Sequence, residues 1–181
     1  MIAEETHLKG CFILKPSIFE DKRGYFFESY NQKKFEDILG EQITFVQDNQ
    51  SLSDYGVLRG LHFQRGQHAQ AKLVRVLSGK VLDVAVDVRE NSSTFGEHVA
   101  IELSEENKKQ FYLPKGFAHG FVVLSKTAVF SYKCDNYYNK ASEGGIIYND
   151  VNLNIDWQLP KNKIIISERD SSLPKFETTE L

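Results

Sequence analysis

Hydrophobic and polar residues alternate along much of this chain with the two-residue period of a half-buried β-strand. Turn signals rich in Gly, Ser and Lys separate the alternating segments. Short strands with frequent turns predict an all-β sandwich or barrel, and the lack of ~10–15-residue helices between them argues against a doubly wound α/β sheet. The clearest strand candidates are residues 72–77, 81–88, 117–124 and 128–132.

One segment has a helical pattern instead. Asn31 is a favourable N-cap residue, and Gly40 is a favourable stop. Between them, Phe35, Ile38 and Leu39 fall on one helical face. The sequence therefore predicts a short helix from Asn31 to Leu39.

Nothing in the sequence divides the chain, because it has no Gly/Ser-rich linker, low-complexity tract or repeat. Residues 1–181 are therefore expected to form one domain. Open sheet edges promote aggregation, so we expect the strands to close into a barrel or a jelly roll, with only a few short helices.

The composition argues against several classes of function and location. The 22 basic and 25 acidic residues give a net charge of −3, and the absence of basic runs argues against nucleic acid as a partner. No apolar run approaches the ~18–20 residues of a membrane span, and the acidic start is unlike a signal peptide. Cys11 and Cys134 form no Cys-x-x-Cys motif, which fits a reduced, cytoplasmic setting.

Polar residues interrupt the strands at positions where alternation predicts apolar ones. His62 has the parity of Leu58 and is therefore expected to face an enclosed space. Singly, such a His or Tyr is usually a hydrogen-bonded core residue, whereas an inward Lys is rare because its desolvation is costly. Their convergence with an Arg, either Arg59 or Arg75, indicates a pocket in the barrel mouth. The interrupting residues are His62, Lys72, His119 and Tyr132.

A metal centre is not predicted. His62 has no second ligand at the spacing usual for metal-binding barrels, and His68 is six residues away in a polar loop. We therefore expect a pocket without metal or cofactor, in which side chains transfer protons. A His can act as base, a Tyr as acid, and a Lys can hold an enolate oxygen.

Longer motifs resemble the dTDP-4-dehydrorhamnose 3,5-epimerases, a family of metal-free cupin-type jelly rolls. The resemblance implies inversion at C3 and C5 of dTDP-4-dehydro-6-deoxy-α-D-glucose, which gives dTDP-4-dehydro-β-L-rhamnose in dTDP-L-rhamnose biosynthesis. It extends over nearly the whole chain in order and spacing. The motifs that carry it include residues 21–28, 47–51, 56–64, 71–76, 79–89, 113–121, 132–138 and 167–170.

The resemblance also implies roles for individual residues. His62 matches the general base, Asp170 its orienting carboxylate, Tyr132 the acid on the opposite face, and Lys72 the group that stabilises the enolate. The family binds its sugar nucleotide in a homodimer with shared active sites. Residues that match its substrate contacts are Arg23, Glu28, Gln47, Asn49, Arg59, His119, Glu143 and Arg169.

Three positions depart from the family pattern. Arg169 stands where many members have Lys, which keeps the charge but changes the geometry of the donor. Gln50 and Leu52 stand where His and Arg are frequent. The alternatives are a C3-only epimerase of a related 4-keto-6-deoxy sugar nucleotide, a metal-dependent cupin enzyme, and a non-catalytic sugar-binding cupin.

Overall fold

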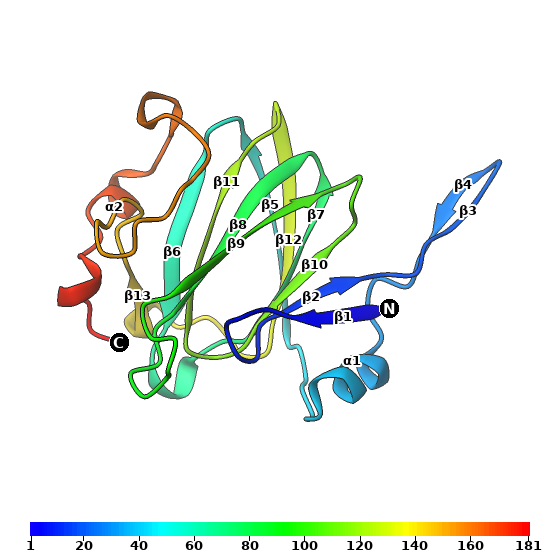
Figure 1. Ribbon diagram of the computed structural model, residues 1–181, viewed down its shortest axis with the longest axis horizontal. Coiled ribbons are helices and arrows are strands. Elements are labelled where there is room, and N and C mark those ends of the chain that lie inside the picture. The colour runs from blue at the N-terminus through cyan, green and yellow to red at the C-terminus, as the bar shows by residue number, and fades with distance from the viewer.

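Two large antiparallel sheets face each other in the computed structural model, which describes residues 1–181 (Figure 1). The six-stranded sheet has the order β1 (Ile2–Glu5), β2 (Phe12–Lys15), β10 (Gln110–Leu113), β7 (Lys72–Ser78), β12 (Thr127–Cys134) and β5 (Gln47–Asp54). The five-stranded sheet has the order β13 (Glu143–Gly145), β6 (Leu58–Gln64), β11 (Phe117–Val123), β8 (Lys80–Asp87) and β9 (His98–Ser104). The all-β prediction is confirmed, and the four strands expected from alternation correspond to β7, β8, β11 and β12.

The helices are short and lie outside the two sheets (Figure 1). No helix is long and apolar enough to cross a membrane. The α-helices are α1 (Gln32–Leu39) and α2 (Glu168–Ser171), and single 3-10 turns occupy Gly66–His68, Lys140–Ser142, Lys161–Lys163 and Phe176–Thr178.

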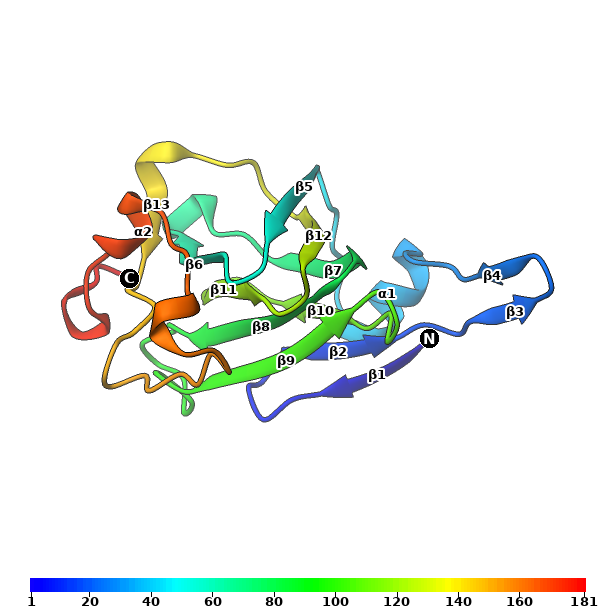
Figure 2. The same ribbon diagram turned by 90° about the horizontal axis from the view of Figure 1, so that it is seen from above.

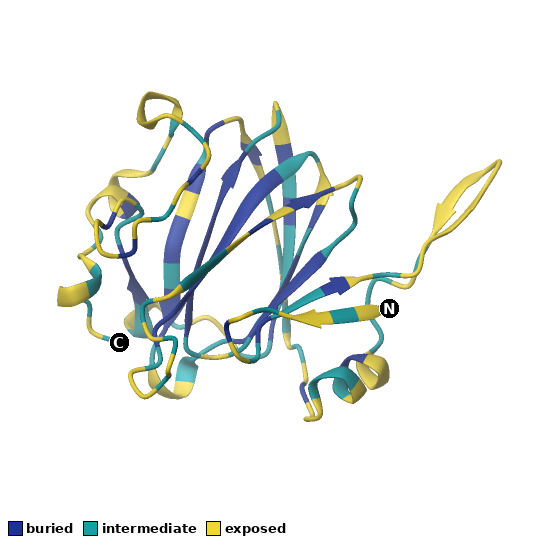
Figure 3. Cartoon of the chain, viewed as in Figure 1, coloured by how far each residue is buried: buried dark blue, intermediate teal, exposed yellow.

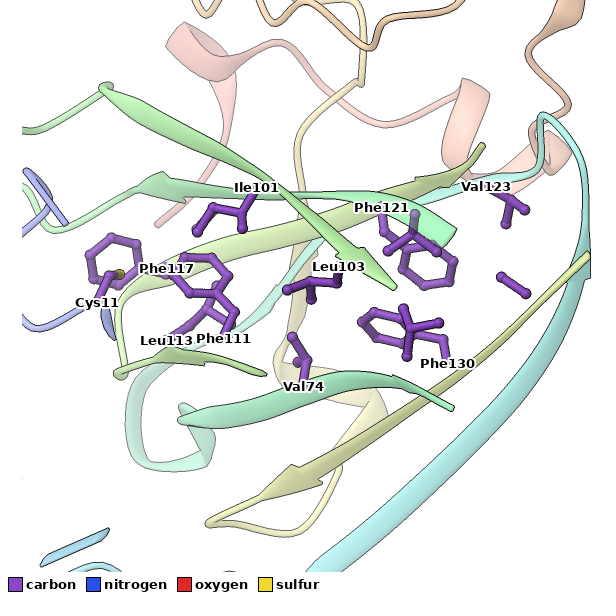
Figure 4. Packing of buried hydrophobic residues seen from close by; sticks show 14 of the residues in the cluster. Cys11, Val74, Ile101, Leu103, Phe111, Leu113, Phe117, Phe121, Val123 and Phe130 are labelled. Carbon is purple, nitrogen blue, oxygen red and sulfur yellow. The ribbon is translucent and has the colours of Figure 1, made fainter. Parts of the chain in front are cut away.

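The main hydrophobic core fills the space between the sheets, as Figure 4 shows. Its side chains come from both sheets and include Val74 of β7, Phe111 of β10, Phe117 of β11 and Phe130 of β12. Phe121 and Phe130 stack across the sheets with ring centroids 4.2 Å apart.

A second core covers the outer face of the five-stranded sheet. Leu82, Val84 and Val86 of β8 pack there against residues of the C-terminal segment, including Ile146 and Trp157. Because β8 is buried on both faces, its sequence is almost entirely apolar. Apart from Lys80 at its start, the exceptions are Asp83 and Asp87, which the alternation places on the inner face and which are both fully buried.

Helix α1 confirms the helix predicted for residues 31–39. The Asn31 side chain accepts a hydrogen bond from the Lys34 N–H, and Gly40 ends the helix in a left-handed conformation. Phe35 anchors the helix to the outer face of the six-stranded sheet, where it contacts Tyr112 edge-on with ring centroids 5.2 Å apart.

The parity argument for His62 is wrong, although its conclusion holds. Leu58 and Leu61 both pack in the outer core, three residues apart, whereas His62 faces the space between the sheets. The register between β6 and β11 shifts by one residue near Gly60, and this bulge breaks the alternation.

A hairpin formed by β3 (Phe19–Asp21) and β4 (Gly24–Phe26) projects from the body of the protein, as Figure 2 shows from above. All of its strand residues are exposed (Figure 3). Phe19 and Phe26 are 65% and 70% exposed, which is unusual for two aromatic side chains on one short hairpin.

Asp87 is expected to make folding stability depend on acidic pH. Burial raises the pKa of its carboxyl group, but hydrogen bonds from Arg89, Ser92 and Thr94 outweigh burial and lower the pKa to about 2. An unfolded Asp titrates near ~3.9, so the ionised form stabilises the fold above about pH 4. This contribution is lost as the pH falls from about 4 to about 2.

Urea unfolding of the wild type and Asp87→Asn tests this expectation. The difference between their free energies of unfolding should shrink by about 2 kcal/mol between pH 5 and pH 2. A difference that stays constant over this range would contradict a low pKa for Asp87.

Candidate active site

A cavity of about 390 Å³ opens between the two sheets and is lined mainly by polar side chains. An adjoining cavity of about 290 Å³ shares Asn49, His62, Lys72 and Tyr132 with it, so the two form one continuous site. The lining residues of the larger cavity are Asn49, Gln50, Ser51, Arg59, His62, Lys72, His119, Gly120, Phe121, Phe130, Tyr132, Ser167, Arg169 and Asp170.

His62 and Asp170 form a hydrogen-bonded pair on the five-stranded side of the cavity. His62 Nε2 lies 2.8 Å from Asp170 Oδ1. Burial raises the pKa of Asp170, but the hydrogen bond and charge of His62 and the Gly60 N–H outweigh burial and lower it. The ionised carboxylate accepts hydrogen bonds only, so Nε2 carries the proton. His62 Nδ1 makes no hydrogen bond within the chain and has a lone pair available as a base.

Local backbone geometry holds Asp170 in place. Ser167 caps α2 by accepting a hydrogen bond from the Asp170 N–H, and the Gly60 N–H donates to Asp170 Oδ2 over 3.1 Å. Gly60 has a φ of 115°, and a Cβ atom there would lie 2.6 Å from the Gly120 Cα. Only glycine fits this close approach of β6 and β11, which aims the Gly60 N–H at the carboxylate.

Lys72 of β7 and Tyr132 of β12 lie on the six-stranded sheet, across the cavity from His62. Burial lowers the pKa of Lys72, against the charges of Cys134, Asp83 and Glu143, which raise it. Burial also raises the pKa of Tyr132. Neither the Lys72 ammonium nor the Tyr132 hydroxyl has a hydrogen-bond partner in the chain. No fully buried side-chain nitrogen or oxygen lacks a partner, so both groups reach the open cavity.

His119 forms a second histidine–aspartate pair. Its Nε2 lies 3.0 Å from each carboxylate oxygen of Asp83, and both side chains are almost completely buried. His119 and His62 are direct register partners on β11 and β6. Asp83 was missed as a site residue, although an acidic residue within the apolar run of β8 is a signal that could have identified it.

The mouth of the cavity carries a second polar cluster. Glu143 accepts hydrogen bonds from the Tyr138 hydroxyl over 2.7 Å and from Arg169. Burial raises the pKa of Glu143, but these two partners outweigh it and lower the pKa. On the larger cavity, the Arg59 Nε donates to the Ser53 hydroxyl over 3.1 Å, which fixes the guanidinium at the cavity wall.

Ten of the twelve predicted site residues come together around the two joined cavities. Gln50 and Leu52, which depart from the family pattern, lie in different surroundings. Gln50 lines the larger cavity, whereas Leu52 is 66% exposed and lines neither of the two cavities. Of the two arginines considered, Arg75 lies on the outer face of the six-stranded sheet, over the Phe27 ring. The ten residues are Gln47, Asn49, Arg59, His62, Lys72, His119, Tyr132, Glu143, Arg169 and Asp170.

Arg23 and Glu28 lie away from these cavities in the same chain. Arg23 is on the projecting hairpin and pairs with Asp21. Glu28 follows the hairpin and pairs with Lys34 of α1 over 2.8 Å. Sequence reasoning also missed Tyr138 and Ser167, neither of which interrupts a strand pattern.

No group of three or more His, Cys, Asp or Glu side chains is arranged to hold a metal ion. The polar groups of the cavity are instead two histidine–aspartate pairs, an ammonium, a phenol and two guanidinium groups. This set can remove a proton, deliver a proton and bind an anion.

Comparisons with known proteins agree on one family. The sequence profile described as dTDP-4-dehydrorhamnose 3,5-epimerase matches residues 5–178. The enzyme of that name from Salmonella typhimurium is 53% identical over 180 residues, which cover 98% of this chain and 96% of that one. The crystal structure of the dTDP-4-dehydrorhamnose 3,5-epimerase from Elizabethkingia anophelis has a TM-score of 0.95 to this chain at 62% identity. The match covers 98% of this chain and 97% of that one.

A further similar crystal structure contains a bound sugar nucleotide. It is dTDP-6-deoxy-D-glucose-3,5-epimerase from Legionella pneumophila in complex with dTDP-4-keto-L-rhamnose. It has a TM-score of 0.94 at 48% identity and covers 98% of this chain and 93% of that one. These likenesses confirm the predicted cupin-type jelly roll.

Proposed function

This chain belongs to the dTDP-4-dehydrorhamnose 3,5-epimerase family, and from that membership we propose that it is the epimerase of dTDP-L-rhamnose biosynthesis. It inverts C3 and C5 of dTDP-4-dehydro-6-deoxy-α-D-glucose and gives dTDP-4-dehydro-β-L-rhamnose. The observation that carries the proposal is the placement of His62 and Tyr132 on opposing sheets of one cavity. Inversion needs a base on one face of the sugar ring and an acid on the other.

The C4 carbonyl acidifies the hydrogens at both C3 and C5, so one pair of groups can serve both centres in turn. His62 removes the proton through Nδ1, and the Asp170 carboxylate stabilises the imidazolium that forms. The electron pair left on carbon moves into the carbonyl, which becomes an enolate. Reprotonation from the opposite face inverts the carbon.

Lys72 and Tyr132 complete the chemistry on the other wall. The Lys72 ammonium has no partner within the chain and is available to stabilise the enolate oxygen. Burial raises the pKa of Tyr132, so this phenol holds its proton at neutral pH until the carbanion takes it.

Incubation with the 4-keto sugar nucleotide in D₂O tests the proposed reaction. Deuterium should enter at both C3 and C5, together with inversion at each carbon. Deuterium at C3 alone would identify a C3-only epimerase instead. A protein that binds the nucleotide without any exchange would be a sugar-binding cupin, and loss of exchange to chelators would favour the metal-dependent alternative.

Tyr132→Phe is expected to separate proton removal from inversion. The variant keeps the ring and its packing against Phe130 but loses the proton donor. Because His62 is intact, deuterium should still exchange at C3 and C5, whereas formation of the inverted product should fall by about 100-fold or more. Equal losses of exchange and inversion, measured by NMR on one sample, would contradict the acid role of Tyr132.

The remaining polar residues suit a nucleoside diphosphate. Arg59 and Arg169 supply guanidinium groups, which bind phosphate oxygens in a bidentate manner. His119 is proposed to contact the sugar. Substrate-contact roles are also proposed for Gln47, Asn49 and Glu143.

We further propose a homodimer in which the projecting hairpin completes the partner's site. Phe19 and Phe26 of the hairpin are exposed to solvent, which is unfavourable for apolar side chains. Arg23 of the same hairpin is distant from the cavity of its own chain. Glu28, just beyond the hairpin, is assigned to the same shared site. A second copy of the chain would cover these side chains and gain a cation for the diphosphate.

Mixing two inactive variants tests the shared site. Equal amounts of the Arg23→Ala and His62→Ala homodimers are mixed, and their subunits are exchanged by mild denaturation and refolding. In a hybrid dimer, one site has an intact His62 and receives an intact Arg23 from its partner, so about one quarter of wild-type activity should return. If Arg23 acts within its own chain, mixing restores nothing.

Domain count and location stay predictions. We propose that residues 1–181 act as one domain, since the two sheets share one core and the family profile spans 5–178. We also propose a cytoplasmic location, supported by Cys11 and Cys134, which are buried and unpaired.

A further inference from the structure

Asp83 is a fully buried carboxylate in the middle of β8, on the inner face of the five-stranded sheet. Its neighbours on that face are Val81 and Ala85, which belong to the central hydrophobic core. A charged group in this position is costly unless it is paired. Its hydrogen-bond partner is His119, whose Nε2 lies 3.0 Å from both carboxylate oxygens.

The proposed reaction does not use this pair. His62 with Asp170 serves as the base, Tyr132 as the acid and Lys72 as the enolate partner. His119 lines the same cavity as all of them and is the direct register partner of His62. The site therefore contains one histidine–aspartate pair with an assigned role and a second without one.

The hydrogen bond to Asp83 determines which nitrogen of His119 faces the cavity. An ionised carboxylate only accepts hydrogen bonds, so Nε2 donates and carries the proton. Nδ1 of His119 has no partner in the chain. Because no fully buried side-chain nitrogen or oxygen is left without a partner, this Nδ1 reaches the open cavity. In that tautomer Nδ1 is a hydrogen-bond acceptor.

The surroundings of His119 keep the ring in this orientation. The Phe130 ring stacks on it with centroids 6.1 Å apart and an interplanar angle of 27°. Phe121, two residues further along β11, also stacks on Phe130, with ring centroids 4.2 Å apart. These rings offer no alternative hydrogen-bond partner, so the ring orientation depends on Asp83.

We propose that Asp83 is a positioning residue for the reaction: it holds His119 with Nε2 protonated, so that Nδ1 accepts a hydrogen bond from a hydroxyl group of the bound sugar ring. This inference rests on the proposed function. It places Asp83 behind His119 as Asp170 stands behind His62. His62 then takes a proton from a carbon of the sugar ring, and His119 holds that sugar ring in place.

The tautomer can be measured on the wild type without any activity assay. Long-range ¹H–¹⁵N correlation spectra of ¹⁵N-histidine-labelled protein should show the Nε2–H form of His119, assigned by its loss in His119→Gln. The Nδ1–H form would overturn the proposal. This readout stays valid if the wild type exchanges no deuterium into the sugar, so failure of the proposed function is distinguishable from failure of this inference.

Asp83→Asn then tests the link to catalysis. The amide keeps the size of the side chain but no longer dictates the proton position, because it can also donate to the ring. We expect kcat to fall about 10- to 100-fold, the loss typical when the carboxylate behind a metal-ligating histidine is removed. KM should change by less than about 3-fold, since most binding contacts remain.

Two comparisons separate positioning from a structural role. Asp87→Asn removes another fully buried carboxylate from the same face of β8, and should lower stability while leaving kcat within about 2-fold of the wild type. In the His119→Gln background, Asp83→Asn should have little further effect on kcat, because its effect acts through His119. Additive losses, or a wild-type kcat in Asp83→Asn, would overturn the inference.

Discussion

His62→Ala is expected to abolish proton exchange at both C3 and C5, with a loss of kcat of about 10³-fold or more. The Nδ1 nitrogen of His62 is free and faces the cavity. Its Nε2 nitrogen is held by the ionised Asp170 carboxylate over 2.8 Å. Alanine removes the base, and the other histidine on that wall, His119, is assigned to holding the sugar rather than to proton removal. Asp170 would remain, but its carboxylate is held by the Gly60 N–H at the cavity edge.

Deuterium incorporation measured separately at C3 and C5 makes this test sharp. Loss at both carbons supports one base for two centres. Exchange that persists at one carbon would show that a second base serves it, and full exchange at both would refute the assignment. His7→Ala is the matched control, since His7 is an exposed histidine whose nearest carboxylate, Glu97, lies 3.8 Å away, and its removal should leave kcat unchanged.

Much of the fold was predictable because local rules and tertiary packing agree. The strands at 72–77, 81–88, 117–124 and 128–132 alternate because one or both faces are buried, and the helix at 31–39 has both caps in place. Inward placement of Lys72, His119 and Tyr132 followed from the same alternation, and the cavity contains all three.

Alternation failed where the backbone departs from a regular strand. The shift near Gly60 places Arg59 and His62 along one cavity although their parities differ. A one-residue bulge reverses the facing of every later side chain, and its one local sign at 58–64 is Gly60, because an isolated glycine within a strand often marks a bulge. The choice between Arg59 and Arg75 could not be made for the same reason.

Contacts between segments that are distant in the sequence also could not be predicted from local residue patterns. Asp170 lies 108 residues from His62, in a C-terminal segment without regular alternation, and only the family resemblance pointed to it. Asp83 was visible as a polar residue in an apolar strand, but its partner His119 is 36 residues away. Pairing of this kind depends on how strands are ordered in the sheet, which a sequence pattern does not specify.

Lys72→Met is expected to change activity and stability in opposite directions. Methionine keeps most of the length of the side chain and removes the ammonium that the enolate oxygen needs. Loss of one such contact costs about 3–4 kcal/mol in the transition state, which corresponds to a fall in kcat of about 10²- to 10³-fold. Exchange at C3 and C5 should fall in parallel, because the enolate itself is destabilised.

Stability should rise in the same variant. Burial lowers the pKa of Lys72, which shows that the folded protein disfavours this charge, and the ammonium has no salt bridge within the chain. Replacing such a group by an apolar one should increase the free energy of unfolding by about 1–2 kcal/mol. Lys80→Met, which removes a lysine whose side chain is 40% exposed and lies 3.3 Å from Glu102, is the control and should change neither quantity appreciably.

The pH dependence of kcat gives an independent readout of the same group. Since burial lowers the pKa of Lys72, the wild type should lose activity on the alkaline side below the ordinary lysine range, as the ammonium gives up its proton. In Lys72→Arg the guanidinium stays charged, so this alkaline decline should move to higher pH even if kcat is reduced. A decline at the same pH in both proteins would assign it to another group, and a Lys72→Met variant that is both active and less stable would leave Lys72 with a structural role only.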